Sequence, residues 1–157
     1  MATDYLPDDE HVVRHLSPRD IIRDEDTQQI TGCFPQAFEL KDGEDDLSVN
    51  WLEYFDGTEP DQLAATACAI SRVRAVRPSH AFAIGNVGEI KAACFDYDLK
   101  VRIIHEPDGG NDAHAAVHRY RDDEIELLEL LAQEIWSRFV DARSCLLRCG
   151  PWRPRPR

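Results

Sequence analysis

Residues 100–120 read KVRIIHEPDGGNDAHAAVHRY, and this stretch decides the class of fold. Residues 100–105 and 113–120 are two runs suited to β-strands, and residues 106–112 between them are rich in Pro, Asp, Gly and Asn. Turn-forming residues between two strand-like runs are typical of an antiparallel hairpin. The stretch therefore predicts a pair of antiparallel strands.

Two helices are predicted, one before and one after this hairpin. Residues 58–61 (TEPD) form a capping sequence, and the apolar positions that follow recur at helical spacing until Arg77-Pro78, which predicts a helix over residues 59–75. Residues 122–142 carry one apolar stripe at helical spacing, which predicts a second core helix. The stripe consists of Ile125, Leu128, Leu131, Ala132, Ile135 and Phe139.

Shorter strand candidates lie at residues 11–16, 36–40, 47–50 and 80–84, and residues 89–95 are suited to a short helix. We therefore expect an α+β fold in which a mainly antiparallel sheet of four to six short strands packs against two main helices. The length of 157 residues fits one domain, placed at residues 11–142. Residues 1–10 are expected to be a disordered acidic tail, and residues 143–157 an Arg- and Pro-rich tail.

Charge sets the expected class of partner. The chain has 30 acidic and 18 basic side chains, and residues 1–62 hold 17 of the acidic but only 4 of the basic groups. Such a surface repels phosphate backbones, so nucleic-acid binding is disfavoured.

No apolar run of about 20 residues exists, and the first ten residues are acidic, so we expect a cytoplasmic protein without a membrane segment. Five widely spaced cysteines argue against a disulfide framework, and Cys68 and Cys94 are expected to be buried thiols.

The aromatic residues of the acidic half predict the main function. Trp51, Tyr54 and Phe55 lie between acidic runs and would form an apolar patch rimmed by carboxylates, which favours binding of a basic partner protein in a non-enzymatic or regulatory role. The other interpretation is that these side chains pack in the core. The basic C-terminal tail would dock on an acidic surface through Trp152, Arg153, Arg155 and Arg157, most simply on the acidic half of its own chain.

Histidines near the hairpin support an alternative function, a small hydrolase or transferase. His114 and His118 lie at even spacing on one strand and therefore share a face, with the small Ala116 between them. Imidazoles beside carboxylates suit acid–base chemistry or metal binding near neutral pH, so a divalent metal is a possible cofactor. The other interpretation is a solvent-facing hairpin tip. The candidate catalytic residues are His105, His114, Asp108 and Asp112, Asn111 is a candidate binding residue, and His105, His114 and His118 are candidate metal ligands.

Two resemblances provide less favoured alternatives. Residues 84–91 (IGNVGEIK) resemble the I-G-x-x-G-x-x-I core of KH domains, and the similarity extends over about residues 63–140. This resemblance implies that the turn from Gly85 to Gly88 clamps a nucleic-acid backbone between two helices. Arg14, His15 and Ser48 are similar in type to the strand residues of ADP-ribosyltransferase-like folds, in which a basic side chain binds the dinucleotide.

Overall fold

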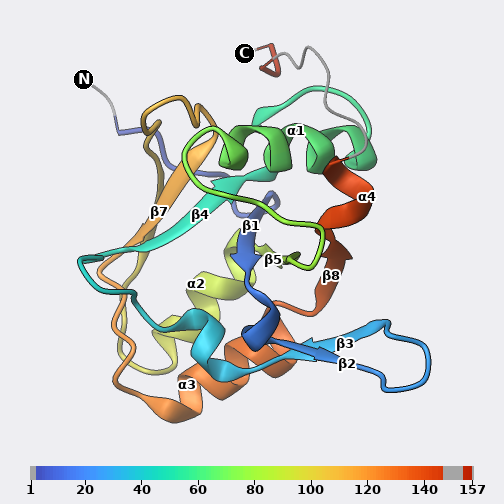
Figure 1. Ribbon diagram of the computed structural model, residues 1–157. Coiled ribbons are helices and arrows are strands. Elements are labelled where there is room, and N and C mark those ends of the chain that lie inside the picture. The colour runs from blue at the N-terminus through green and yellow to red at the C-terminus, as the bar shows by residue number, and fades with distance from the viewer. Residues whose placement is uncertain (1–2, 147–153, 157) are drawn as a thin grey trace.

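The computed structural model describes residues 3–146 and 154–156, and its largest element is a six-stranded antiparallel sheet (Figure 1). The strand order is β6-β7-β4-β1-β5-β8, so the central strands come from the first half of the chain. A two-stranded ribbon, β2 (Ile21–Arg23) with β3 (Ile30–Cys33), projects from the body. The sheet strands are β1 (His11–Leu16), β4 (Leu47–Trp51), β5 (Ala81–Asn86), β6 (Arg102–His105), β7 (His114–His118) and β8 (Arg138–Asp141).

Helices cover both faces of the sheet. On one face, called here the α1 face, α1 (Glu59–Ser71) and α4 (Ala142–Leu146) pack on Val13, Phe82 and Ile84. On the other, called the α2 face, α2 (Val87–Phe95) and α3 (Ile125–Leu130) enclose a larger core. Side chains alternate between the faces along each strand, which explains why Val12 and Val13 belong to different clusters. The predicted α+β class is thereby confirmed.

The start of α1 follows from its capping sequence. The Thr58 hydroxyl accepts a hydrogen bond from the Asp61 backbone N–H, and the Asp61 carboxylate accepts one from the Thr58 backbone N–H. These reciprocal bonds satisfy amide groups that have no partner within the helix. The helix ends at Ser71, before the predicted residue 75.

The single helix predicted over residues 122–142 is wrong. Here α3 ends at Leu130, one π-helical turn (Leu131–Ile135) follows, and Phe139 lies in β8, where it pairs with Ala83. The strand predicted at residues 36–40 is also wrong, because Pro35–Phe38 form a 3-10 helix. In both segments tertiary packing overrides the local sequence pattern, since Phe38 and Trp136 are fully buried and their ring centroids lie 5.2 Å apart. Two further 3-10 helices span Pro18–Asp20 and Leu52–Tyr54.

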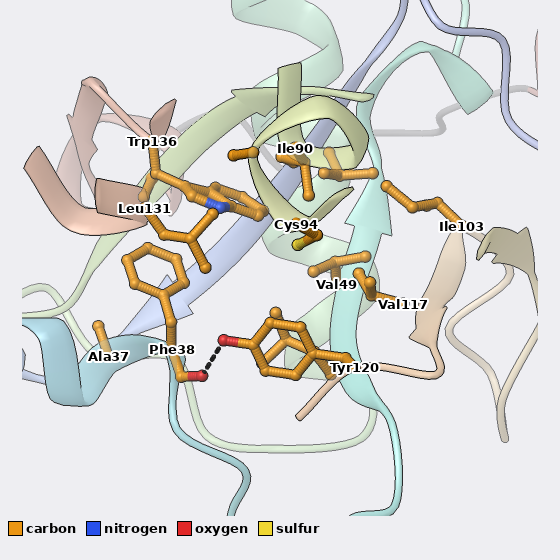
Figure 2. Packing of buried hydrophobic residues seen from close by; sticks show 14 of the residues in the cluster. Ala37, Phe38, Val49, Ile90, Cys94, Ile103, Val117, Tyr120, Leu131 and Trp136 are labelled. Carbon is orange, nitrogen blue, oxygen red and sulfur yellow. Dashed lines mark hydrogen bonds between the residues drawn. The ribbon is translucent and has the colours of Figure 1, made fainter. Parts of the chain in front are cut away.

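Figure 2 shows how this core is closed around Phe38. The Trp136 indole and Leu131 pack beside the Phe38 ring, while the buried Tyr120 hydroxyl donates to the Phe38 carbonyl oxygen at 2.6 Å. Burial raises the pKa of Tyr120 well above its ordinary value, so the hydroxyl remains a donor. The bond ties the segment after β7 to the 3-10 helix before β4.

Of the two cysteines predicted to be buried thiols, only one is a thiol in the structure. Cys94 is a buried thiol as predicted, and burial raises its pKa to about 12. Cys33 and Cys145 are also buried thiols. The thiol predicted at Cys68 is wrong, because Cys68 is disulfide-bonded.

The ends of the chain take part in the fold where they are described. We expected residues 1–10 to be disordered, yet Asp4 and Leu6 exchange backbone hydrogen bonds with β6, and Leu6 is buried. In the basic tail, Arg143 lies in α4, and Trp152, Arg153 and Arg157 lie outside the described residues. No helix in residues 3–146 is long and apolar enough to cross a membrane.

Candidate functional site

Three of the predicted site residues form an aromatic cluster, defined as Trp51, Tyr54 and His105. Trp51 ends β4, Tyr54 follows in a 3-10 helix, and His105 ends β6. The ring centroids lie 5.3 Å apart for Trp51 and His105, 5.1 Å for Tyr54 and His105, and 6.1 Å for Trp51 and Tyr54. His105 Nε2 donates to the Asp112 carbonyl oxygen at 2.7 Å, which fixes the orientation of its ring.

An arginine from the C-terminal segment lies on this cluster. The Arg155 guanidinium lies 5.6 Å from the Trp51 ring centroid and donates to both Glu10 oxygens, at 2.9 and 3.1 Å. Trp51 Nε1 donates to the same carboxylate at 2.7 Å, so Glu10 joins the indole and the guanidinium. The Arg155 backbone N–H donates to the Tyr54 carbonyl oxygen at 2.7 Å, and Pro154 forms a bridge with Phe55.

The electrostatic environment of Arg155 is strongly negative. Its hydrogen bonds to Glu10 raise the pKa of Arg155, and the charges of Glu53 and Asp56 act in the same direction. His11 binds Glu53 through its backbone N–H and its ring, with the ring Nδ1 2.6 Å from Oε2. A planar cation that stacks on an indole and makes two parallel bonds to a carboxylate is the specific chemistry of arginine.

The three predicted histidines do not converge. His114 pairs with Asn50 and therefore lies on the α1 face with Ala116 and His118. His105 pairs with Ala115, which places it on the α2 face. Among the residues that the structure describes, no three His, Cys, Asp or Glu side chains are grouped so as to hold a metal ion.

Glu106 contacts both histidines that flank Ala116. The Glu106 carbonyl oxygen accepts from His114 Nδ1 at 2.8 Å, and its carboxylate contacts His118 Nε2 at 2.7 Å. The other ring nitrogen of His118 lies 3.2 Å from the Asp46 carboxylate. His118 is thus held by two carboxylates, whereas the second ring nitrogen of His114 contacts Ser48.

The polar residues of the hairpin loop mainly close the turn. Asp108 and Asn111 exchange backbone hydrogen bonds of 3.1 and 2.8 Å, and Asp112 contacts His105 through its main-chain oxygen. The side chain of Asn111 is buried, and its amide group forms two hydrogen bonds, of 2.8 and 3.0 Å, with the side-chain amide of Asn50. No contact joins the carboxylates of Asp108 or Asp112 to a histidine in the described part of the chain.

A second polar site lies on the α1 face where β1 and β4 diverge. Ser48 Oγ lies 2.8 Å from His114 Nε2, and the Arg14 guanidinium donates to the Ser48 carbonyl oxygen at 2.8 Å. The structure therefore brings together the Arg and Ser of the ADP-ribosyltransferase-like pattern. A small hollow beside them is lined by Arg14, His15, Ser48, Asn50, Arg74 and Asn111, among others.

The glycine motif has a different setting from the one that the KH resemblance implies. Gly85 lies in β5 and Gly88 in α2, so the motif connects a strand to a helix within residues 81–95. Asn86 caps α2 by accepting from the Glu89 backbone N–H at 2.9 Å. The turn between two helices that would clamp a nucleic acid is not formed here.

Comparisons with known proteins give no further guidance: no family model, curated protein or solved structure matches the chain.

Sequence reasoning missed Glu10, Asn50 and Glu106 as site residues. Glu10 bonds Arg155 across 145 positions, and nothing in the local pattern marks that pairing. Asn50 was detectable in principle, because an Asn between the apolar residues Val49 and Trp51 of a strand needs a buried polar partner.

Proposed function

We propose that the protein binds a basic partner protein through its acidic surface, in a non-enzymatic or regulatory role. The aromatic cluster and Glu10 would receive an arginine side chain of the partner. The observation that carries this proposal is the position of Arg155, which already makes the contacts that such a side chain would make.

The contacts of Arg155 support arginine over lysine. Two nearly parallel N–H bonds reach one carboxylate, and the flat guanidinium lies over an indole, neither of which a single ammonium group reproduces. The acidic excess of residues 1–62 would steer a basic chain toward this site at low ionic strength. The pairing of Pro154 with Phe55 adds backbone docking of an extended segment.

Because Arg155 occupies the site, a partner must displace the chain's own C-terminal segment. A chain with Arg155→Gln therefore offers the vacant site, and a synthetic peptide PRPRP serves as the probe. Calorimetric titration should show at least tenfold tighter binding to Arg155→Gln than to the unchanged chain. Adding Glu10→Gln should abolish the gain, since the amide keeps an acceptor for Trp51 Nε1 but loses the charge.

Glu134→Gln in the Arg155→Gln background is the matched control, because Glu134 is an exposed carboxylate on another part of the surface. It should retain the tenfold gain. Equal affinity in all four proteins, or equal binding of a PKPKP peptide, would refute the proposed site.

A cytoplasmic location is also part of the proposal, supported by the buried thiols of Cys33 and Cys94. The cytoplasm would keep Cys68 reduced as well, in contrast to its bonded state in the structure. Alkylation of thiols in intact cells, followed by mass spectrometry of the Cys68 peptide, tests the location. Alkylated Cys68 supports the cytoplasm, and protected Cys68 contradicts it.

A further inference from the structure

Buried polar side chains are concentrated at the hollow on the α1 face. Five polar or charged residues are buried in the described part of the chain, and Arg14, Asn50 and Asn111 are three of them. All three line the hollow, together with Ser48 and the exposed Arg74. Their hydrogen bonds to one another and to main-chain oxygens satisfy these groups and hold a polar lining beside Ser48.

The hydrogen bonds of His114 determine which ring nitrogen carries the proton. The Glu106 carbonyl oxygen can only accept, so His114 Nδ1 must be the donor across the 2.8 Å contact. In the neutral ring Nε2 is then unprotonated and accepts from the Ser48 hydroxyl at 2.8 Å. This is the tautomer that a general base needs beside a serine nucleophile.

We propose that Ser48 and His114 are the nucleophile and the general base of a hydrolytic site for small carboxylic esters whose acyl group carries a negative charge. This activity goes beyond the proposed partner binding. It uses the opposite face of the sheet from His105, and neither Glu10 nor Arg155 takes part in it.

The reaction has two balanced steps. Ser48 Oγ attacks the ester carbonyl carbon while its proton passes to His114 Nε2, and the tetrahedral intermediate collapses when the alkoxide leaves with that proton as an alcohol. Water then attacks the acyl-serine, His114 Nε2 takes the water proton, and the proton returns to Ser48 Oγ as the carboxylic acid departs. No metal ion or redox partner is required.

Positive charge beside Ser48 would select the substrate and stabilise the oxyanion. Arg14 alternates with Val13 along β1, so its side chain starts from the α2 side, and its guanidinium reaches the gap between β1 and β4 by donating to the carbonyl oxygens of Ala37, Ser48 and Glu39. There it contributes positive charge behind Ser48 rather than a direct contact with the hydroxyl. Arg74 lines the same hollow. Asn50 Nδ2 donates one N–H to Asn111 Oδ1, and within the described residues its second N–H makes no hydrogen bond, so it is a suitable donor for an oxyanion.

The size of the hollow limits how the substrate is placed. Its volume of about 10 Å³ suits roughly one water molecule, so only the reacting carbonyl group would enter. A neighbouring hollow of about 400 Å³ shares His15 with it and is lined by Arg19 and Lys41 but also by Asp20, Glu39 and Asp42. That larger hollow would therefore hold the uncharged alcohol part of the ester, and the acyl carboxylate would lie near Arg74 beside Ser48.

A fluorophosphonate probe followed by peptide mass spectrometry tests the nucleophile on the full chain. We expect labelling at Ser48, abolished by Ser48→Ala and reduced at least 100-fold in rate by His114→Gln. Ser144→Ala is the matched control, because Ser144 is an exposed serine of α4 whose hydroxyl donates to the Asp141 carbonyl oxygen. It should label at the rate of the unchanged chain.

Hydrolysis of mono-p-nitrophenyl succinate and of p-nitrophenyl acetate tests the substrate class. The unchanged chain should favour the succinate ester at least tenfold in kcat/KM, and Arg74→Gln should remove this preference while Lys100→Gln, the same charge change on an exposed residue elsewhere, retains it. Absence of the label from Ser48, or equal turnover by Ser48→Ala, would overturn the assignment. Circular dichroism of each variant separates these outcomes from misfolding.

Discussion

Gly85 provides a quantitative test of the core, because the indole of Trp136 packs directly on its backbone. A Cβ atom at this position would lie 2.9 and 3.0 Å from Trp136 Cδ2 and Cε3 and 3.1 Å from Ile90 Cδ1. Contacts this short force the indole to move, and such overpacking costs about 3 kcal/mol. The alanine would regain up to about 1 kcal/mol by restricting the unfolded chain. The expected net loss for Gly85→Ala is therefore about 2 kcal/mol.

Urea unfolding followed by tryptophan fluorescence measures this loss. With a slope of about 2 kcal/mol per M for a chain of this size, the midpoint should fall by about 1 M. Gly32→Ala is the matched control in another strand, since its nearest neighbour would be Ile22 Cδ1 at 3.9 Å. Equal midpoints for the two variants would show that Trp136 does not pack on Gly85 as described.

Three further predictions concern proton uptake, a buried hydrogen bond and a helix cap. Burial, reinforced by His80 and nearby cations, lowers the pKa of His15 from 6.5 to about 3, so the unfolded chain takes up a proton at a higher pH than the folded chain. Stability should therefore fall as pH decreases from 6.5 toward 3, by about 2 kcal/mol between pH 7 and 5. Urea midpoints at the two pH values should show a smaller fall in His15→Gln, and an identical fall would contradict the shift. Tyr120→Phe removes the donor to the Phe38 carbonyl oxygen and should cost about 1 to 2 kcal/mol in the same assay, whereas an unchanged midpoint would mean that the bond contributes nothing. Thr58→Ala removes the cap of α1 and should cost about 1 kcal/mol, so a variant as stable as the unchanged chain would refute the role of the cap.

Local patterns predicted the elements whose signals are themselves local. The capping sequence at Thr58 gave the start of α1, and the turn residues between His105 and His114 gave the β6–β7 hairpin. The apolar stripe that ends at Phe139 was misleading, because an apolar side chain in a half-buried edge strand satisfies the same spacing. Pairing of β8 with β5 depends on residues about 55 positions apart, and periodicity carries no information on such pairing.

The candidate sites show the same division. Trp51, Tyr54 and Phe55 were predicted to form an apolar surface patch because they lie between acidic runs, but Trp51 and Phe55 are buried, as the core-packing interpretation has it. The structure places Trp51 and Tyr54 with His105 in one cluster. The shared face of His114 and His118 followed from strand alternation, but the opposite placement of His105 required the register of β6 on β7. The pairing of Ser48 with His114 likewise depends on the β4–β7 register, which turn chemistry alone does not determine.

The most direct test of the arginine site is the NMR resonance of the Trp51 indole N–H in the Arg155→Gln chain as PRPRP peptide is added. The proton lies on the bond to Glu10, so occupation of the site by a guanidinium should shift its resonance in a saturable way, whereas that of Trp136 stays in place. The Lys-containing peptide should produce a much weaker change. If the Trp51 resonance does not respond to the arginine peptide, the aromatic cluster and Glu10 are not a docking site for a basic partner.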